Sequence, residues 1–422
     1  MNEWSYRRRL RADLEAWVGD GRLTADAAEA VRAALGPDPR RAGAAHYAAI
    51  AGVVLLGAAV LVFVAANWQA VPRLGRLGLL TGLIATAFAT GGWAARAGRS
   101  HVADLAATLG CIAFGATIAL VGQMYHLPKD LAGGLFLWAM GALAAAALTG
   151  ARGAFAVAAV SGFVWTATLG VGGEAGLHLA FWPFWAALAV LALVWQSPAA
   201  RHLSALIFFG WWDVVAVHLL NAGRDSPHVA PIFAGAALGL GLALLVEGHG
   251  AKRLRAFAAV FADYAVFALA FALASGLALG FIGGGRGVGF AHWPAWLVVV
   301  SMLGVVALLV ASLRLRPWQA PAAYAGALAL TALMLHFGAL DMVVRGALAL
   351  AAAVLMLIAG ASGDRRPRLV AGWLAFAAVV AYLVWSLGGG LLDRALLLAL
   401  ASFATMGVAA LLRKFSKEGG AA

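Results

Sequence analysis

An acidic residue and a histidine lie inside one apolar run of the sequence, 201–220, which is an unusual place for ionisable side chains. Asp213 is near the middle of the run and His218 follows it. Such groups are costly within a membrane span and therefore mark functional candidates. A carboxylic acid in an apolar setting can load and release a proton, and a nearby imidazole could extend the relay. Trp211 and Trp212 flank the acid and could shape a dry pocket. The alternative is a neutral Asp213 hydrogen-bonded to another helix.

A second acidic residue, Asp263, lies inside the apolar run 256–281 beside Tyr264. We expect it to join Asp213 as a proton-coupling candidate, by the same argument. His101 and Asp104 are three positions apart at the start of another apolar run, so they share a helical face. For that pair an interfacial location is the favoured interpretation.

Polar and aromatic side chains gather where two other apolar runs end, at Asn67, Trp68, Gln123, Tyr125 and His126. Amide, hydroxyl and imidazole groups at one membrane level suit the binding of a polar headgroup or a sugar. Interfacial anchoring is the alternative. It accounts for Trp68 and Tyr125 but less well for Gln123.

Membrane-spanning helices must position these residues. Of the 422 residues, 64% are hydrophobic and 11% are charged, against about 25% charged in soluble domains. This excludes a soluble enzyme, a disordered protein, a disulfide scaffold and a fibrous repeat. The sequence predicts an all-α, polytopic membrane protein of about 14 transmembrane helices, because each apolar run is long enough, or nearly so, to cross about 30 Å of hydrocarbon. The runs are 46–66, 76–93, 103–121, 131–148, 154–170, 181–195, 201–220, 229–246, 256–281, 292–313, 321–337, 342–360, 368–385 and 392–412.

The distribution of Lys and Arg predicts the orientation. With the N-terminus inside, 23 of the 30 fall on the cytoplasmic side and 7 on the outer side, which is a strong positive-inside signal. We therefore expect both termini in the cytoplasm. The formal charge of +12 is explained by this topology, so no nucleic-acid partner is expected.

The first 45 residues differ in composition from the rest and predict a small cytoplasmic helical hairpin with a Pro linker. The turn is expected at Asp20-Gly21, and Thr24 is the expected N-cap of the second helix. The hairpin could dock a cytosolic partner, but a membrane-surface role for its arginines is favoured. We divide the remainder of the chain into two regions. Residues 46–160 hold the first four apolar runs and the start of the fifth, and residues 161–422 hold the remaining runs and a basic tail.

Sequence patterns in the first third of the chain resemble a known bacterial family. Ala65-Ala66-Asn67-Trp68 ends the first apolar run, Gly122-Gln123-Met124-Tyr125-His126 ends the third, and Gly21-Arg22-Leu23-Thr24 precedes an Ala/Glu-rich helix. Together these resemble the predicted membrane proteins called domain of unknown function 2157, over roughly residues 10–160. The resemblance implies a polytopic bacterial membrane protein, which we expect in the inner membrane, and brings no established activity.

Three functions fit these observations. The leading one is a secondary transporter or flippase for a small polar or lipid-linked substrate, coupled to protons. The alternative is a non-transporting sensor or assembly protein that recruits a cytosolic or membrane protein partner through its N-terminal hairpin. An enzyme is less favoured, because no paired catalytic acid and base stand out. The sequence shows no metal-site spacing and no nucleotide-binding motif, so no cofactor is expected.

Overall fold

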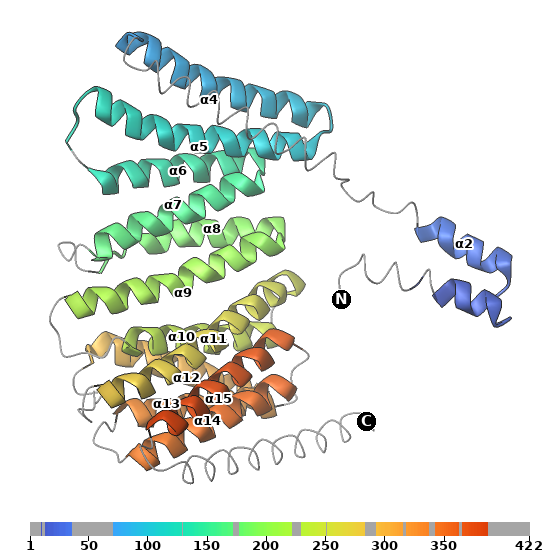
Figure 1. Cartoon of the computed structure of the whole chain (residues 1–422), viewed down its shortest axis with the longest axis vertical. Coiled ribbons are helices and arrows are strands. Elements are labelled where there is room, and N and C mark those ends of the chain that lie inside the picture. The colour runs from blue at the N-terminus through green and yellow to red at the C-terminus, as the bar shows by residue number, and fades with distance from the viewer. Residues whose placement is uncertain are drawn as a thin grey trace. The chain divides into compact units, whose positions relative to one another are not determined.

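The structure is a computed structural model that describes residues 10, 13–35, 71–128, 130–171, 177–221, 229–249, 251–282, 293–314, 318–336, 342–362 and 365–386. Within these ranges the chain is helical and contains no strand, so the all-α prediction is confirmed for them (Figure 1). The helices are α2 (Ala25–Leu35), α4 (Arg73–Arg96), α5 (Ser100–Met124), α6 (Leu131–Thr149), α7 (Arg152–Val171), α8 (Phe181–Trp195), α9 (Pro198–Asn221), α10 (Val229–His249), α11 (Lys252–Ile282), α12 (Ala295–Arg314), α13 (Gln319–His336), α14 (Met342–Ser362) and α15 (Arg366–Ser386).

The chain divides into two compact units, Met1–Arg76 and Leu77–Ala422. In the first unit residues 13–19 are helical, and a turn follows in which Gly21 has a φ of 69°. The hydroxyl of Thr24 accepts the backbone N–H of Ala27 at 3.4 Å. Thr24 is therefore the N-cap of α2, because its oxygen satisfies one of the free amides of the first turn.

The helices from α4 to α15 match twelve of the predicted apolar runs, and ten of them are long and apolar enough to cross a membrane. The chain is thus a multi-pass membrane protein. The first and last predicted runs, 46–66 and 392–412, lie outside the described residues. The helix α8 has 15 residues, whereas α11 has 31. These Ala- and Leu-rich segments favour helix, and a helix satisfies its own backbone hydrogen bonds in lipid.

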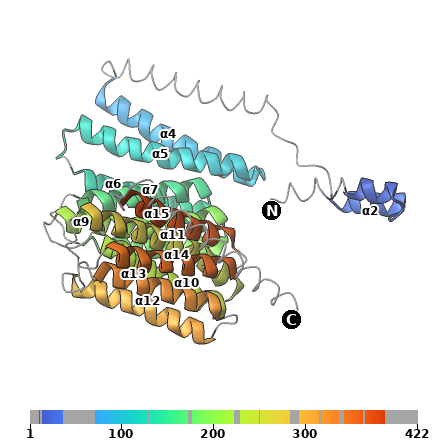
Figure 2. The ribbon, with the colours of Figure 1, turned by 60° about the horizontal axis from the view of Figure 1, so that its bottom comes forward.

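In the second unit α10 packs against both α11 and α12, and α14 packs between α13 and α15. The helix α11 also contacts α15, which brings together segments about a hundred residues apart in the sequence (Figures 1 and 2). Small residues permit the closest approaches. A Cβ on Gly304 of α12 would overlap the backbone of Ala237 in α10, so this position requires glycine.

Aromatic side chains fill the core between α8, α9 and α11. Trp182 lies 4.8 Å from Trp211, measured between ring centroids, and Trp185 lies 5.2 Å from Phe208. The indole N–H of Trp185 donates to the backbone carbonyl of Ser204 at 2.9 Å. These large rings hold α8 against α9, because offset and edge contacts add to their area of burial.

Candidate functional site

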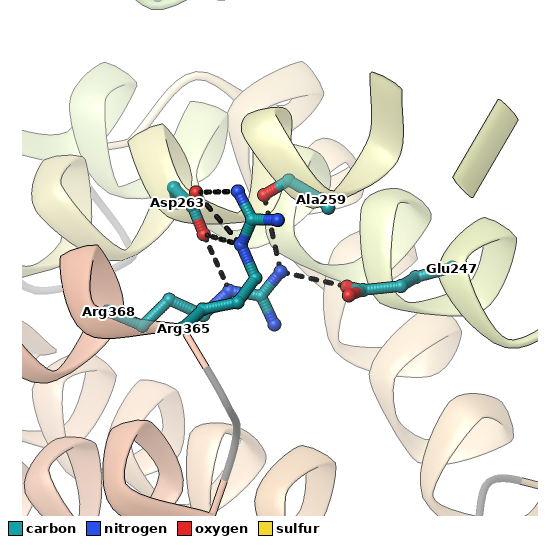
Figure 3. Close-up of polar contacts among 5 residues, drawn as sticks. All are labelled: Glu247, Ala259, Asp263, Arg365 and Arg368. Carbon is teal, nitrogen blue, oxygen red and sulfur yellow. Dashed lines mark hydrogen bonds and ion pairs between the residues drawn. The ribbon is translucent and has the colours of Figure 1, made fainter. Parts of the chain in front are cut away.

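Four charged side chains meet where α10 ends, α11 begins and α15 begins (Figure 3). Glu247 lies in the last turn of α10, and Asp263 lies in the first half of α11. Arg365 directly precedes α15, and Arg368 lies in its first turn. We call these four residues the charge network. It exists because α11 packs against both α10 and α15.

Asp263 is the centre of the charge network. Arg365 donates from Nε to both carboxylate oxygens, at 3.0 and 3.1 Å, and from Nη2 to Oδ2 at 2.5 Å. Arg368 donates from Nε to Oδ1 at 2.8 Å. Two guanidinium groups therefore share one carboxylate, and bidentate pairing of this kind fixes geometry as well as charge.

Arg368 also links Asp263 to the neighbouring helix. Its Nη2 donates to Oε2 of Glu247 at 2.8 Å and to the backbone carbonyl of Ala259 at 3.2 Å. The side chain of Arg368 is 8% exposed and that of Asp263 is 5% exposed, against 30% for Glu247 and 38% for Arg365. The network thus has a buried inner pair and two partly exposed outer members, and its two positive and two negative charges balance.

The hydroxyl of Tyr324 in α13 is buried and has no hydrogen-bond partner among the described residues. The residue is 1% exposed, and the charges of Arg368, Asp263 and Glu247 act on its phenol. Leaving a buried hydroxyl unpaired costs about 1–3 kcal/mol. The region beside the charge network therefore contains an unused hydrogen-bonding group.

Asp213 has a different environment from Asp263. Its side chain is exposed on α9, and no hydrogen bond or ion pair to it occurs among the described residues. The flanking Trp211 and Trp212 are both 3% exposed and pack into the core, on Phe181 and Trp296 respectively. Asp213 is accordingly an unpaired carboxyl group on the surface of a candidate span.

His218 is half-buried on the same helix, α9, and its Nδ1 lies 3.1 Å from the carbonyl oxygen of Gly170 in α7. No hydrogen bond or ion pair joins His218 to Asp213. A second histidine, His178, lies between α7 and α8 and shares a hydrogen bond of 2.7 Å with the buried hydroxyl of Thr166. Burial lowers the pKa of His178 below its ordinary value, because an apolar environment disfavours the imidazolium ion.

The predicted binding residues of the third apolar run lie at the end of α5. Gln123 is in its last turn, Tyr125 caps the helix, and His126 follows with a φ of 52°. All three side chains are exposed. The structure brings these three together at one helix end, while Asn67 and Trp68 lie outside the described residues.

Asp104 of α5 has a structural role. Its Oδ1 accepts the backbone N–H of Gly153 at 3.0 Å. Gly153 is in the first turn of α7, so Asp104 caps that helix from a neighbouring one and its negative charge faces the positive end of the helix dipole. His101, its partner in the sequence, is exposed.

The N-terminal third of the chain also matches a known family. Residues 15–155 match the family model Predicted membrane protein (DUF2157). The resemblance expected from the Asn-Trp and Gly-Gln-x-Tyr patterns is confirmed for this part of the chain. The match ends before α8, so the charge network lies outside it. No curated protein and no solved structure matches the chain.

Asp263 stands out in the sequence as an acidic residue inside an apolar run. Glu247, Arg365 and Arg368 lie at or just beyond the ends of apolar runs, where charges are ordinary, so no local pattern connects them with Asp263. The sequence does offer one indication that the four residues could meet, because all four lie towards the same predicted side of the bilayer. In the described part of the chain no group of three His, Cys, Asp or Glu residues could hold a metal ion.

Proposed function

We propose that this multi-pass membrane protein is a secondary transporter or flippase of a small polar or lipid-linked substrate. The observation that supports it is the charge network, which joins three helices within an otherwise apolar body. Charged groups at membrane depth are rare and tend to mark pathways for substrates or ions. Purely structural packing would be served as well by apolar side chains.

Proton coupling in this proposal depends on the contrast between two carboxyl groups. Asp263 is held by two arginines, whereas Asp213 has no partner among the described residues. An unpaired carboxyl group can change its protonation state without breaking an ion pair. We therefore assign proton exchange to Asp213. His218, on the same helix, extends the proton relay, and Asp263 provides a fixed charge. The end of α5, with Gln123, Tyr125 and His126, together with Asn67 and Trp68, is the proposed substrate-binding region.

The proposal places the protein in a bacterial inner membrane with both termini in the cytoplasm, and the distribution of Lys and Arg supports this orientation. The charge network then lies towards the cytoplasmic side, because α15 begins there and α10 ends there. Treating sealed inside-out vesicles with a protease that cleaves the N-terminal unit would test the orientation. Loss of that unit supports it, and protection of the unit contradicts it.

Transport is tested with the full chain reconstituted in liposomes. Movement of a fluorescent anionic phospholipid between leaflets is followed by chemical quenching of the outer leaflet, and proton entry is followed with an enclosed pH-sensitive dye. We expect lipid movement that depends on pH, and its loss in Asp213→Asn. Unchanged, pH-dependent movement in Asp213→Asn rejects the proton-coupling role, and rates equal to those of empty liposomes for both probes reject the proposal.

A second candidate is the sensor or assembly protein, which is favoured by one observation. Residues Met1–Arg76 form a compact unit of their own, with Trp17 and Val31 each 38% exposed. Exposed apolar side chains on a small unit suit a protein partner. Deleting residues 1–40 separates the two functions. Loss of a cellular phenotype with retained lipid movement supports the sensor, while a phenotype that persists after deletion contradicts it.

A further inference from the structure

Two helix pairs on either side of the charge network are packed backbone against backbone. In the first, between α10 and α12, Gly241 and Gly304 face one another so closely that neither position has room for a Cβ. In the second, between α14 and α15, a Cβ on Gly360 would lie 2.9 Å from the backbone of Leu369. Interdigitated backbones leave little room for sliding, so each pair is expected to move as one body.

The two bodies are joined by α11, which packs against both α10 and α15, and charged side chains bridge the same junction. Arg368 of α15 bonds to Glu247 of α10 and to Asp263 of α11, as Figure 3 shows. Long, flexible side chains make these bonds, so they can break without repacking of the helix backbones. Separating a buried ion pair is costly where the charges find no other partner. The connection between the bodies can therefore open only if Arg368 has another hydrogen-bonding group to turn to.

The hydroxyl of Tyr324 is the candidate second partner for Arg368. It is buried and unpartnered among the described residues, and the charge of Arg368 acts on it. Arg368 bonds through Nε and one terminal nitrogen, while a guanidinium carries five N–H donors. If Arg368 released Asp263, the phenol could accept one of its hydrogens and limit the cost of the lost ion pair.

We propose that the charge network is a reversible lock between the α14–α15 and α10–α12 pairs, in which Arg368 exchanges Asp263 and Glu247 for Tyr324 when the network opens. The described structure is the locked state. The role of the lock as a gate rests on the proposed transport function. The opening of the lock can be measured without any transport.

The test measures how readily a cysteine next to the charge network reacts with a membrane-impermeant maleimide. Cys111 is the only cysteine of the chain, so Cys111→Ala removes the background. Ala259, 5% exposed and bonded to Arg368 through its carbonyl, is then replaced by cysteine. The matched control is Ala272→Cys, which is 0% exposed on the same helix but lies away from the network. The full chain is used in liposomes open to the reagent on both sides.

We expect Asp263→Asn and Arg368→Gln each to raise the labelling rate at position 259 at least tenfold, with no rise at position 272. Arg365→Gln should raise it less than threefold, because Arg368 still joins the helices. Equal rates in wild type and both inner-pair variants would overturn the lock. A rise at both cysteines would also overturn it, because it would show general loosening of the fold.

The role of Tyr324 is tested by adding Tyr324→Phe to Asp263→Asn. Loss of the hydroxyl removes the second partner, so labelling at position 259 should fall at least threefold from the rate of the single variant. An unchanged rate would overturn the exchange of partners. Faster labelling with no lipid or proton movement in the wild type would retain the lock and reject transport. Transport by the wild type, with labelling rates that the inner-pair variants leave unchanged, would reject the lock and retain transport.

Discussion

The carboxylate of Asp263 accepts the Nε hydrogen of Arg368 at 2.8 Å, and both side chains are almost completely buried. This bond joins α11 to α15 in the interior of the protein. An ion pair in such a place is costly to form and still more costly to leave half-made. The stability of the membrane body should therefore depend strongly on both partners being present.

Replacing Asp263 by Asn should destabilise the protein by about 3–5 kcal/mol, because it leaves the positive charge of Arg368 poorly compensated in a buried position. Thermal unfolding of the purified protein in detergent measures the change. The matched control is Asp213→Asn, which should stay within about 0.5 kcal/mol of wild type because Asp213 is exposed and unpaired. Equal losses in the two variants would contradict the importance of the network.

The two arginines should contribute unequally. Arg368→Gln removes bonds to Asp263, Glu247 and Ala259 at a side chain that is 8% exposed, whereas Arg365 is 38% exposed and bonds to Asp263. Partly exposed ion pairs are weakened by solvent and contribute about 0–1 kcal/mol. We expect the thermal stability loss for Arg368→Gln to exceed that for Arg365→Gln at least twofold. The opposite order would show that the outer pair carries the connection.

Gly304→Ala should weaken the contact between α10 and α12, because the new methyl group would overlap the backbone of Ala237. Overpacking of this kind costs about 1–3 kcal/mol. The matched control is Gly82→Ala in α4, where a Cβ would meet nothing within 4 Å. That change should be neutral or stabilising, since alanine favours helix. Comparison of the two unfolding temperatures is the measurement, and equal values would contradict the close packing.

Stability should fall on mild acidification because of His178. Burial lowers the pKa of this residue below 6.5 in the folded protein, so the unfolded chain binds the proton more readily as pH falls below about 6.5. The contribution of neutral His178 is complete above pH 6.5 and is lost as pH falls through the folded-state value.

Unfolding temperatures recorded between pH 7.5 and 5 test this, with His178→Gln as the variant. Gln cannot titrate in this range, so the acid-dependent loss should become smaller than in wild type. The same pH slope in both proteins would assign the effect to other groups.

Asp104→Ala should cost about 1 kcal/mol of stability, since it removes the carboxylate that caps α7 through Gly153. His101→Ala, three residues earlier and exposed, is the control and should be nearly silent. Measuring both by thermal unfolding distinguishes a helix cap from general charge removal. A silent Asp104→Ala would show that solvent or lipid headgroups replace the cap.

Local patterns predicted most of the fold. Each of the twelve apolar runs between 76 and 385 is a helix in the structure, because length and hydrophobicity are properties of a single segment. The site depends on which segments adjoin. Asp263 stands out in an apolar run, but no local pattern shows that Arg368, 105 residues later, packs against it. A count of positive charges treats Arg368 as a loop residue, although the fold buries it.

The length of α11 has a consequence for the lipid around it. Its 31 residues extend about 46 Å at about 1.5 Å per residue, while the hydrocarbon core is about 30 Å thick. The excess must be absorbed by tilt or by extension into the headgroup layer. Because Asp263 lies on this helix, bilayer thickness becomes a physical variable acting on the protein, and membranes of different acyl-chain length should shift the position of the Asp263 carboxylate relative to water.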